Sequence, residues 1–252
     1  MSKTKKTGLR QFFRHIDPKP AFKRWGRRNL LRRHYAGFIT NGDLCFDIGA
    51  NIGDRVGIFL SLGGRIVAVE PQPPCVEVLS AQYGGNPRVT ILPAAVGAGN
   101  GIQDMFVSGS STISSMSPGW IEAVKKSDRF PGVSWDKKIR VDVITVDELV
   151  KRFGRPAFIK IDVEGFEEEV IRGIVSPVKA LSFEFTPEYA DTAIRSIRHL
   201  GGLGPVELNF SPGETMSFIS PQKWFPVEAM VEEIGRLRKD RGMNGDIYVR
   251  GL

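Results

Sequence analysis

Two glycines four residues apart, at the end of a short apolar run, constrain the fold of this chain more than any other feature. Residues 43–48 suit a buried parallel strand, and Gly49 and Gly53 then bracket a tight turn into a helical stretch. A second apolar run, residues 65–69, ends in an acid, Glu70, which lies 17 residues after Gly53. A carboxylate about 20 residues beyond such a turn can bind both hydroxyls of an adenosine ribose. The spacing predicts a nucleotide-binding turn in an α/β domain.

The composition of this turn indicates which adenosine cofactor it suits. A dinucleotide turn reads G-x-G-x-x-G, because its middle glycine lets the backbone approach a pyrophosphate. Here Asn51 stands between the two glycines, and the acidic Asp47 precedes them. A carboxylate would repel a pyrophosphate, whereas it suits a ligand with an ammonium and a sulfonium. The turn therefore favours S-adenosylmethionine over NAD or ATP.

Several motifs together resemble the FkbM-type methyltransferases of the class I methyltransferase superfamily. The similarity extends from about residue 43 to about residue 250. The motifs are Asp47-Ile-Gly-Ala-Asn-Ile-Gly53, Val69-Glu-Pro71, Ala94-Ala-Val-Gly97, Gly109-Ser-Ser-Thr112 and Phe158-Ile-Lys-Ile-Asp-Val-Glu-Gly165. The resemblance implies a Rossmann-like seven-stranded sheet of order 3-2-1-4-5-7-6 with the last strand antiparallel. It also implies S-adenosylmethionine as cofactor, and methylation of a hydroxyl on a sugar, glycan or polyketide-like acceptor.

The resemblance also assigns roles to individual residues. Its cofactor-binding positions fall here on Asp47, Gly49, Asn51, Gly53, Glu70, Pro71, Ala95, Val96 and Asp162. Its serine-rich motif, which covers the cofactor or contacts acceptor hydroxyls, falls on Ser110, Ser111 and Thr112.

The rest of the chain alternates strand and helix patterns, as a doubly wound sheet requires. Strands are expected at 65–69, 89–95, 157–163, 178–185, 206–210 and 246–249, and helices at 73–83, 146–153, 166–172 and 187–200. Thr145 is expected to cap the helix at 146–153, in a capping box with Glu148. An insertion at about 99–141 interrupts the alternation. We expect a strand pair there, 102–107 with 138–144, that frames a loop and a short helix.

Three acids are the candidate catalytic residues. Asp162 and Glu164 alternate on a segment that we expect to be extended, so both side chains should point to one side. Glu184, on the expected neighbouring strand, can join them. Ligands bind beyond the carboxyl ends of the strands in such sheets, so these acids should lie beside the cofactor.

Close carboxylates cannot all ionise cheaply, and three interpretations of this group remain open. One acid could be a general base with a raised pKa. The acids could instead hold Mg²⁺, which would lower the pKa of an acceptor hydroxyl. Alternatively, Lys160 neutralises one acid in a buried pair. Trp120 and Trp135, which flank the long loop, are expected to pack within it rather than to stack on a sugar.

Positive charge is concentrated at the N-terminus. Residues 1–40 hold twelve Lys or Arg and one acid, Asp17, whereas the remaining 212 residues hold 23 Lys or Arg and 27 acids. Aromatic and leucine side chains interleave with basic ones between residues 22 and 38 at partly helical spacing. We divide the chain into this basic extension, 1–40, and a methyltransferase domain, 41–252. The extension could cap the domain, lie on an anionic membrane surface or glycan, or bind nucleic acid, the last being disfavoured.

Composition predicts a cytoplasmic protein. No apolar run is long enough to span a membrane, and the N-terminus lacks the apolar core of a secretory signal. Cys45 and Cys75 suit reduced thiols that act as small apolar side chains, and no Cys or His spacing indicates a metal site. Two other classes share the turn and Glu70. They are an NAD-dependent oxidoreductase and a non-catalytic nucleotide-binding module.

Overall fold

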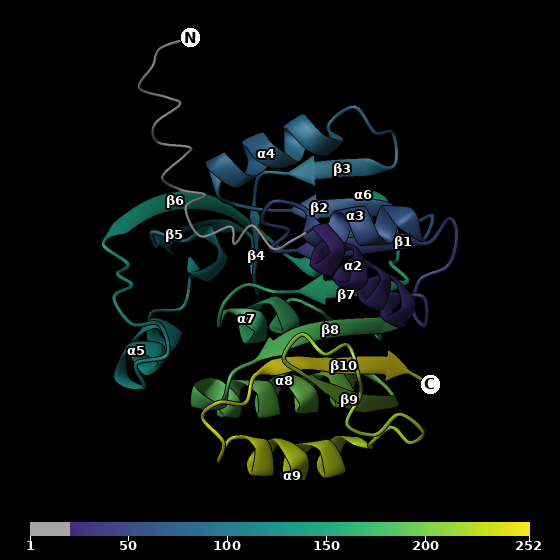
Figure 1. Ribbon diagram of the computed structural model, residues 1–252, viewed down its shortest axis with the longest axis vertical. Coiled ribbons are helices and arrows are strands. Elements are labelled where there is room, and N and C mark those ends of the chain that lie inside the picture. Colours follow the sequence, from purple (N-terminus) through teal and green to yellow (C-terminus); the bar gives the residue numbers. More distant parts are fainter. Residues whose placement is uncertain (1–20) are drawn as a thin grey trace.

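Seven strands form one central sheet in the computed structural model, which describes residues 21–252 (Figure 1). The strands are β1 (Leu44–Ile48), β2 (Arg65–Val69), β3 (Val89–Leu92), β7 (Phe158–Ile161), β8 (Ala180–Phe185), β9 (Val206–Pro212) and β10 (Gly245–Gly251). Their order is β3-β2-β1-β7-β8-β10-β9, and β10 runs antiparallel to both of its neighbours. This is the order that the resemblance implied, so the prediction of a methyltransferase sheet is confirmed.

The alternation of side chains along β1 and β2 separates two hydrophobic cores, one on each face of the sheet. Phe46 of β1 and Val67 of β2 point into one core, and Cys45 and Ile66 point into the other. The first face is covered by α6 (Val146–Phe153), α7 (Glu167–Arg172), α8 (Ala190–Leu203) and α9 (Val227–Leu237). The second is covered by α2 (Ala21–Tyr35), α3 (Asp54–Ser61) and α4 (Pro73–Tyr83). Because both faces are covered, the parallel strands are mostly apolar, and the buried charges of Asp47 in β1 and Lys160 in β7 are exceptions.

A second sheet of three strands lies beside the carboxyl ends of the parallel strands (Figure 1). It consists of β4 (Ala95–Val96), β5 (Gly101–Val107) and β6 (Lys137–Ile144), with β6 in the middle. The predicted strand pair is confirmed, since β5 and β6 are antiparallel. Between them lie η1 (Ser111–Ile113) and α5 (Pro118–Lys126). The insertion therefore has regular secondary structure, and it lies beside the carboxyl ends of the parallel strands.

The main differences from the sequence prediction concern two strands and one helix. The strand expected at 89–95 divides at Pro93, which has no N–H to donate to a ladder, and its end becomes β4 of the second sheet. The strand expected at 157–163 ends at Ile161. Helix α9 was not predicted, although Met230 and Ile234 follow a helical spacing and both are buried. Capping by Thr145 is confirmed, because its side chain accepts a hydrogen bond from the Glu148 backbone.

Helix α2 belongs to the segment that the sequence analysis assigned to the basic extension, and it packs on the domain. Leu31 and Tyr35 are buried there, and Phe38 packs against the same core. These apolar side chains are therefore not available to a membrane surface. The part of the extension before residue 21 lies outside the described residues.

Within residues 21–252, no helix combines the length and the apolar character needed to cross a membrane.

Candidate active site

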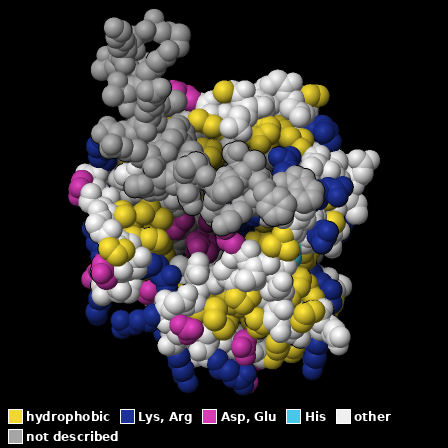
Figure 2. Space-filling view, viewed as in Figure 1, with side chains coloured by type: hydrophobic (Ala, Val, Ile, Leu, Met, Phe, Trp, Pro, Cys, Tyr) yellow, Lys and Arg dark blue, Asp and Glu magenta, His cyan; other side chains and the backbone are white. Residues whose placement is uncertain are grey.

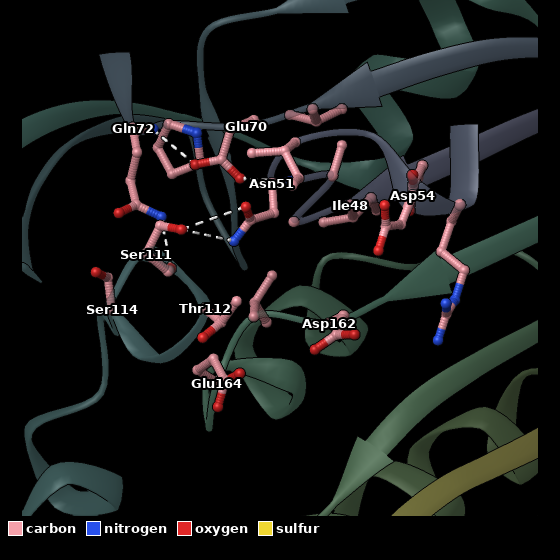
Figure 3. A pocket seen from close by; sticks show the side chains of 18 of the residues that line it. Ile48, Asn51, Asp54, Glu70, Gln72, Ser111, Thr112, Ser114, Asp162 and Glu164 are labelled. Atoms are coloured by element: carbon pink, nitrogen blue, oxygen red, sulfur yellow. Dashed lines mark hydrogen bonds between the residues drawn. The ribbon is translucent and has the colours of Figure 1, made fainter. Parts of the chain in front are cut away.

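A cavity of about 920 Å³ opens at the carboxyl ends of β1, β2 and β7 (Figure 3). Its walls come from the turn after β1, the end of β2, the loop at residues 110–116, the turn after β7 and helix α2. The volume lies at the upper end of the range for small-molecule sites. The cavity therefore has room for an adenosine cofactor and for part of a second ligand.

The turn after β1 adopts the left-handed backbone that its glycines allow. Gly49, Asn51 and Gly53 have φ angles of 81°, 48° and 91°. A Cβ at Gly49 would lie 1.9 Å from the backbone oxygen of Asp162, so only glycine lets β1 and β7 end this close together. Gly53 does not line the cavity. It precedes α3 and packs against Tyr83, so its role in the site is to shape the turn.

Glu70 holds this turn in place. One carboxylate oxygen accepts a hydrogen bond from the Asn51 backbone N–H at 2.9 Å, and the other accepts from the Gln72 N–H at 2.8 Å (Figure 3). Only 2% of Glu70 is exposed. Burial raises the pKa of Glu70 to about 7, although the two backbone amides act in the opposite direction. The acid predicted to bind a ribose thus also fixes the turn to the neighbouring strand.

The serine-rich loop closes one side of the cavity, as Figure 3 shows. The Asn51 side chain lies 3.4 Å from the Ser111 Oγ, and the Gln72 side chain donates to the Ser111 carbonyl at 3.0 Å. Ser110 and Thr112 bond to each other through their hydroxyls at 2.8 Å. Because Ser111 is hydrogen-bonded to Asn51 and Gln72, this loop and the first turn form walls of the same cavity.

The turn after β7 carries the candidate catalytic acids. Glu164 has a φ of 53° and Gly165 a φ of 87°, so the extended segment that we expected there is instead a tight turn. The Glu167 side chain causes this, because one of its oxygens accepts hydrogen bonds from the N–H groups of Val163 and Gly165, each at 3.1 Å. Burial raises the pKa of Glu167 to about 7.

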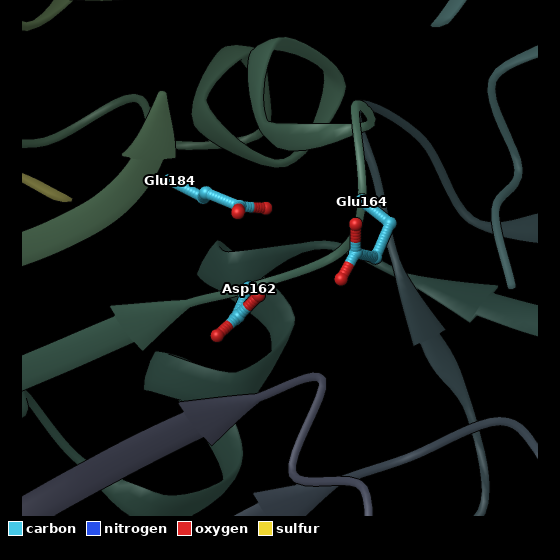
Figure 4. Close-up of side chains that lie close together, drawn as sticks. All are labelled: Asp162, Glu164 and Glu184. Atoms are coloured by element: carbon cyan, nitrogen blue, oxygen red, sulfur yellow. The ribbon is translucent and has the colours of Figure 1, made fainter. Parts of the chain in front are cut away.

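Three acids nevertheless converge as predicted. One carboxylate oxygen from each of Asp162, Glu164 and Glu184 lies within 4.8 Å of the others, and Figure 4 shows the side chains turned toward a shared space. Burial, together with neighbouring carboxylates, raises the pKa values of Glu164 and Glu184 well above their ordinary range. Glu184 lies outside the large cavity and lines a separate small pocket. In Figure 2 acidic side chains gather near the centre of the face, close to α7 and the end of β8 in Figure 1.

Lys160 neutralises part of this acidic group. It is 1% exposed, and its ammonium lies 2.7 Å from Asp246 and 3.4 Å from Asp162. Burial alone would lower the pKa of Lys160, but the acids around it raise it, so the ammonium stays charged. Its closer partner, Asp246 of β10, was expected only to begin a strand. No local pattern could identify this pair, because 86 positions separate the two residues.

Two further charged groups lie in the cavity wall. Asp47 is 2% exposed, and its Oδ2 has no hydrogen-bond partner among the described residues. Burial raises the pKa of Asp47 to about 7. Arg55, in the first turn of α3, was not considered in the sequence analysis, although it follows Gly53 by only two positions.

The remaining predicted residues behave as follows. Pro71, Ala95 and Val96 line the cavity, as expected for cofactor contacts. Trp120 and Trp135 are buried and pack edge to face at 6.2 Å, which confirms their packing role.

The geometry agrees with a comparison to known families. The family model of the FkbM methyltransferase domain matches residues 47–201, which is more than half of the chain. The chain belongs to the FkbM methyltransferase family. This match includes the first turn, Glu70, the serine-rich loop and all three clustered acids.

The individual proteins that this FkbM chain resembles share less than 30% sequence identity with it. Hexuronic acid methyltransferase AglP of Haloferax volcanii is 28% identical over 160 residues, which are 63% of this chain and 61% of that protein. The chain thus spans about three fifths of the length of that relative. Among solved structures, the precorrin-6y C5,15-methyltransferase of Geobacter metallireducens GS-15 is similar with a TM-score of 0.46 and 13% identity, over 89% of this chain and 87% of that one. A spermidine synthase is similar with a TM-score of 0.44 and 13% identity, over 89% and 58%.

Proposed function

We propose that this protein transfers a methyl group from S-adenosylmethionine to a hydroxyl group of a sugar or glycan. Membership of the FkbM family supports methyl transfer. The observation that carries the oxygen acceptor is the group of Asp162, Glu164 and Glu184 beside the cavity, because a hydroxyl must lose its proton as it is methylated. The relative named for hexuronic acid supports a sugar as acceptor.

The residues around the cavity fit the cofactor. Glu70 uses two of its lone pairs on backbone amides, and a carboxylate has about four, so acceptors remain for ribose hydroxyls. Asp47 offers an unpartnered oxygen to a cation. Pro71, Ala95 and Val96 give apolar surface. When bound, S-adenosylmethionine supplies a methyl group already activated by its sulfonium.

The work left to the protein is positioning and proton removal. Holding the acceptor in line with the methyl group is worth about 7–11 kcal/mol of barrier. The acceptor's proton passes to the acid cluster, in which Glu164 lines the cavity and a Glu184 oxygen lies within 4.8 Å of a Glu164 oxygen. A pKa raised above the ordinary carboxylate range brings a base closer to the working pH, where proton transfer is most effective.

A divalent cation is the competing interpretation of the same cluster. The three oxygens are close enough to share one ion, and such an ion would lower the pKa of the acceptor hydroxyl. Lys160 already places an ammonium 3.4 Å from Asp162, which weakens the demand for a metal. We therefore propose acid–base chemistry without a metal. Turnover that is unchanged after EDTA treatment agrees with this, and loss of turnover that Mg²⁺ restores would contradict it.

The direct test is to incubate the protein with S-adenosylmethionine and a panel of acceptors and to measure S-adenosylhomocysteine. The panel pairs uronic acids and their glycosides with the corresponding neutral sugars. Methylated product identified by mass spectrometry and NMR would establish both the acceptor and the methylated oxygen. Tight binding of NAD by calorimetry, with none of S-adenosylmethionine, would reject the proposal in favour of an oxidoreductase.

A further inference from the structure

Two buried polar atoms of opposite charge remain unpaired in the same cavity. Asp47 lies near the end of β1 and Arg55 in the first turn of α3, so they lie on the two sides of the first turn, and both line the cavity. Within the described part of the chain, neither Asp47 Oδ2 nor Arg55 Nε has a hydrogen-bond partner, and both atoms are buried. A buried polar group without a partner is costly, so such atoms in a ligand cavity point to missing partners.

Other charges near Arg55 do not supply those partners. Asp246 and Asp162, which surround it together with Asp47, both lie against the ammonium of Lys160. Burial would lower the pKa of Arg55, but Tyr35 and these three acids raise it, so the guanidinium stays charged. Asp47 and Arg55 thus each keep a polar atom without a partner among the described residues, and no ion pair joins the two side chains.

A guanidinium prefers a carboxylate, and a carboxylate prefers an ammonium. An α-amino acid carries both groups on one carbon. We infer that Arg55 binds the α-carboxylate of the methionine portion of S-adenosylmethionine, while Asp47 binds its α-ammonium. This inference rests on the proposed function, and it assigns a cofactor contact to a residue that no motif identified.

The charged side chains immediately around Arg55 suit the same ligand. Three acids (Asp47, Asp162 and Asp246) and two bases (Arg55 and Lys160) give a net charge of −1 when all are ionised. The methionine portion has a carboxylate, an ammonium and a sulfonium, which sum to +1. The cofactor thus neutralises the group, whereas a ligand with only a carboxylate would add to its negative charge.

The test measures binding by calorimetry, without acceptor, for three probes. S-adenosylmethionine has the complete amino-acid group, decarboxylated S-adenosylmethionine lacks only the carboxylate, and 5′-methylthioadenosine lacks the carboxylate, the ammonium and the sulfonium charge. For Arg55→Met we expect about 10- to 100-fold weaker binding of S-adenosylmethionine, in the range of one charged hydrogen-bonded contact. Binding of the other two probes should change by less than about threefold, since neither carries a carboxylate.

Two variants serve as controls. Arg55→Lys keeps a cation and should restore part of the affinity for S-adenosylmethionine. Arg88→Met removes one exposed positive charge far from the cavity lining and should leave all three affinities unchanged. Circular dichroism of each variant checks the fold.

Three results would overturn the inference. Equal weakening of all three probes would make Arg55 a structural counter-ion. Unchanged affinity for S-adenosylmethionine, with a raised KM for an acidic acceptor, would assign Arg55 to the acceptor. Failure of the unaltered protein to bind S-adenosylmethionine would reject the proposed function itself, and it is distinguished from the other two results because it appears before any substitution.

Discussion

The turns after β1 and after β7, which line the cavity, have similar backbone structures but place different side chains in the cavity wall. Each contains a non-glycine residue with positive φ, Asn51 after β1 and Glu164 after β7, and each is held by a buried glutamate that accepts two backbone hydrogen bonds. The first turn is held by Glu70, which comes from the neighbouring strand. The second is held by Glu167, which lies only three positions further along.

This difference separates two tasks. The first turn is fixed by a tertiary contact and places the Asn51 side chain in the cavity wall beside the serine-rich loop, which suits recognition of a ligand. The second is fixed locally and presents the Glu164 carboxylate to the cavity, which suits proton transfer. We therefore expect substitutions in the first turn to change cofactor affinity, and those in the second to change the rate.

The largest expected effect tests the second turn. Glu164→Gln should lower kcat by about 10²- to 10⁴-fold, because it removes the proposed base, and it should change the affinity for S-adenosylhomocysteine by less than about threefold. Steady-state kinetics and calorimetry measure the two quantities. Glu169→Gln, at a partly exposed acid of α7 that pairs with Arg172, is the matched control and should leave kcat unchanged. Undiminished kcat in Glu164→Gln would remove the functional contrast between the turns.

The next test concerns the contact between the two turns. Gly49→Ala would place a methyl group 1.9 Å from the Asp162 backbone, and Gly165→Ala would place one 2.1 Å from Trp120. Both positions also have positive φ, so each substitution should cost about 3 kcal/mol of folding stability or more. Gly85→Ala, with open space around it, should change stability by less than about 0.5 kcal/mol. Urea unfolding measures all three, and a stable Gly49→Ala variant would show that the turns are not in tight contact.

A smaller effect separates the two supporting glutamates. Glu70→Ala should weaken S-adenosylhomocysteine binding by about 10- to 100-fold, because the turn loses its acceptor and the ribose loses a partner. Glu167→Ala should lower kcat while cofactor affinity stays within about threefold. Calorimetry and initial rates on the same preparations give both values. If both variants lose affinity alike, the turns form a single unit rather than two.

The smallest effect is a dependence of stability on pH. The pKa of Glu167 is raised from 4.5 to about 7 in the folded protein, so the folded state binds its proton more tightly than the unfolded state does. Its contribution is present below pH 4.5 and is lost as the pH rises through 7. Between pH 5 and pH 8 the unaltered protein should therefore lose about 2 kcal/mol more stability than Glu167→Gln. Equal losses in urea unfolding at the two pH values would contradict the raised pKa.

The parts of this fold that sequence predicts are those encoded by local patterns. The first turn, Glu70 and the strand order follow from apolar runs, glycine spacing and a family resemblance, and all were found. Helix α9 also has a local signal, the spacing of Met230 and Ile234, so the sequence alone was sufficient to predict it.

Other features depend on contacts that no local pattern encodes. The partner of Lys160 is Asp246, which reaches it only because β10 enters the sheet beside β8. The shape of the second turn depends on a side chain, Glu167, that folds back on the backbone before it. A ligand-binding role for Arg55 could not be predicted from the sequence, because it depends on the unpaired Asp47 on the other side of the turn. In each case the residues are evident in the sequence, but the contacts between them are evident only in the tertiary structure.

The ion pair of Lys160 and Asp246 also has a consequence for the folding of the chain during its synthesis. A ribosome must extend the chain past residue 246 before the buried ammonium of Lys160 meets its closest counter-ion. A nascent chain that stops earlier has five parallel strands but leaves that charge in an apolar layer without its main partner. The buried ion pair of Lys160 and the seven-stranded sheet are therefore completed together.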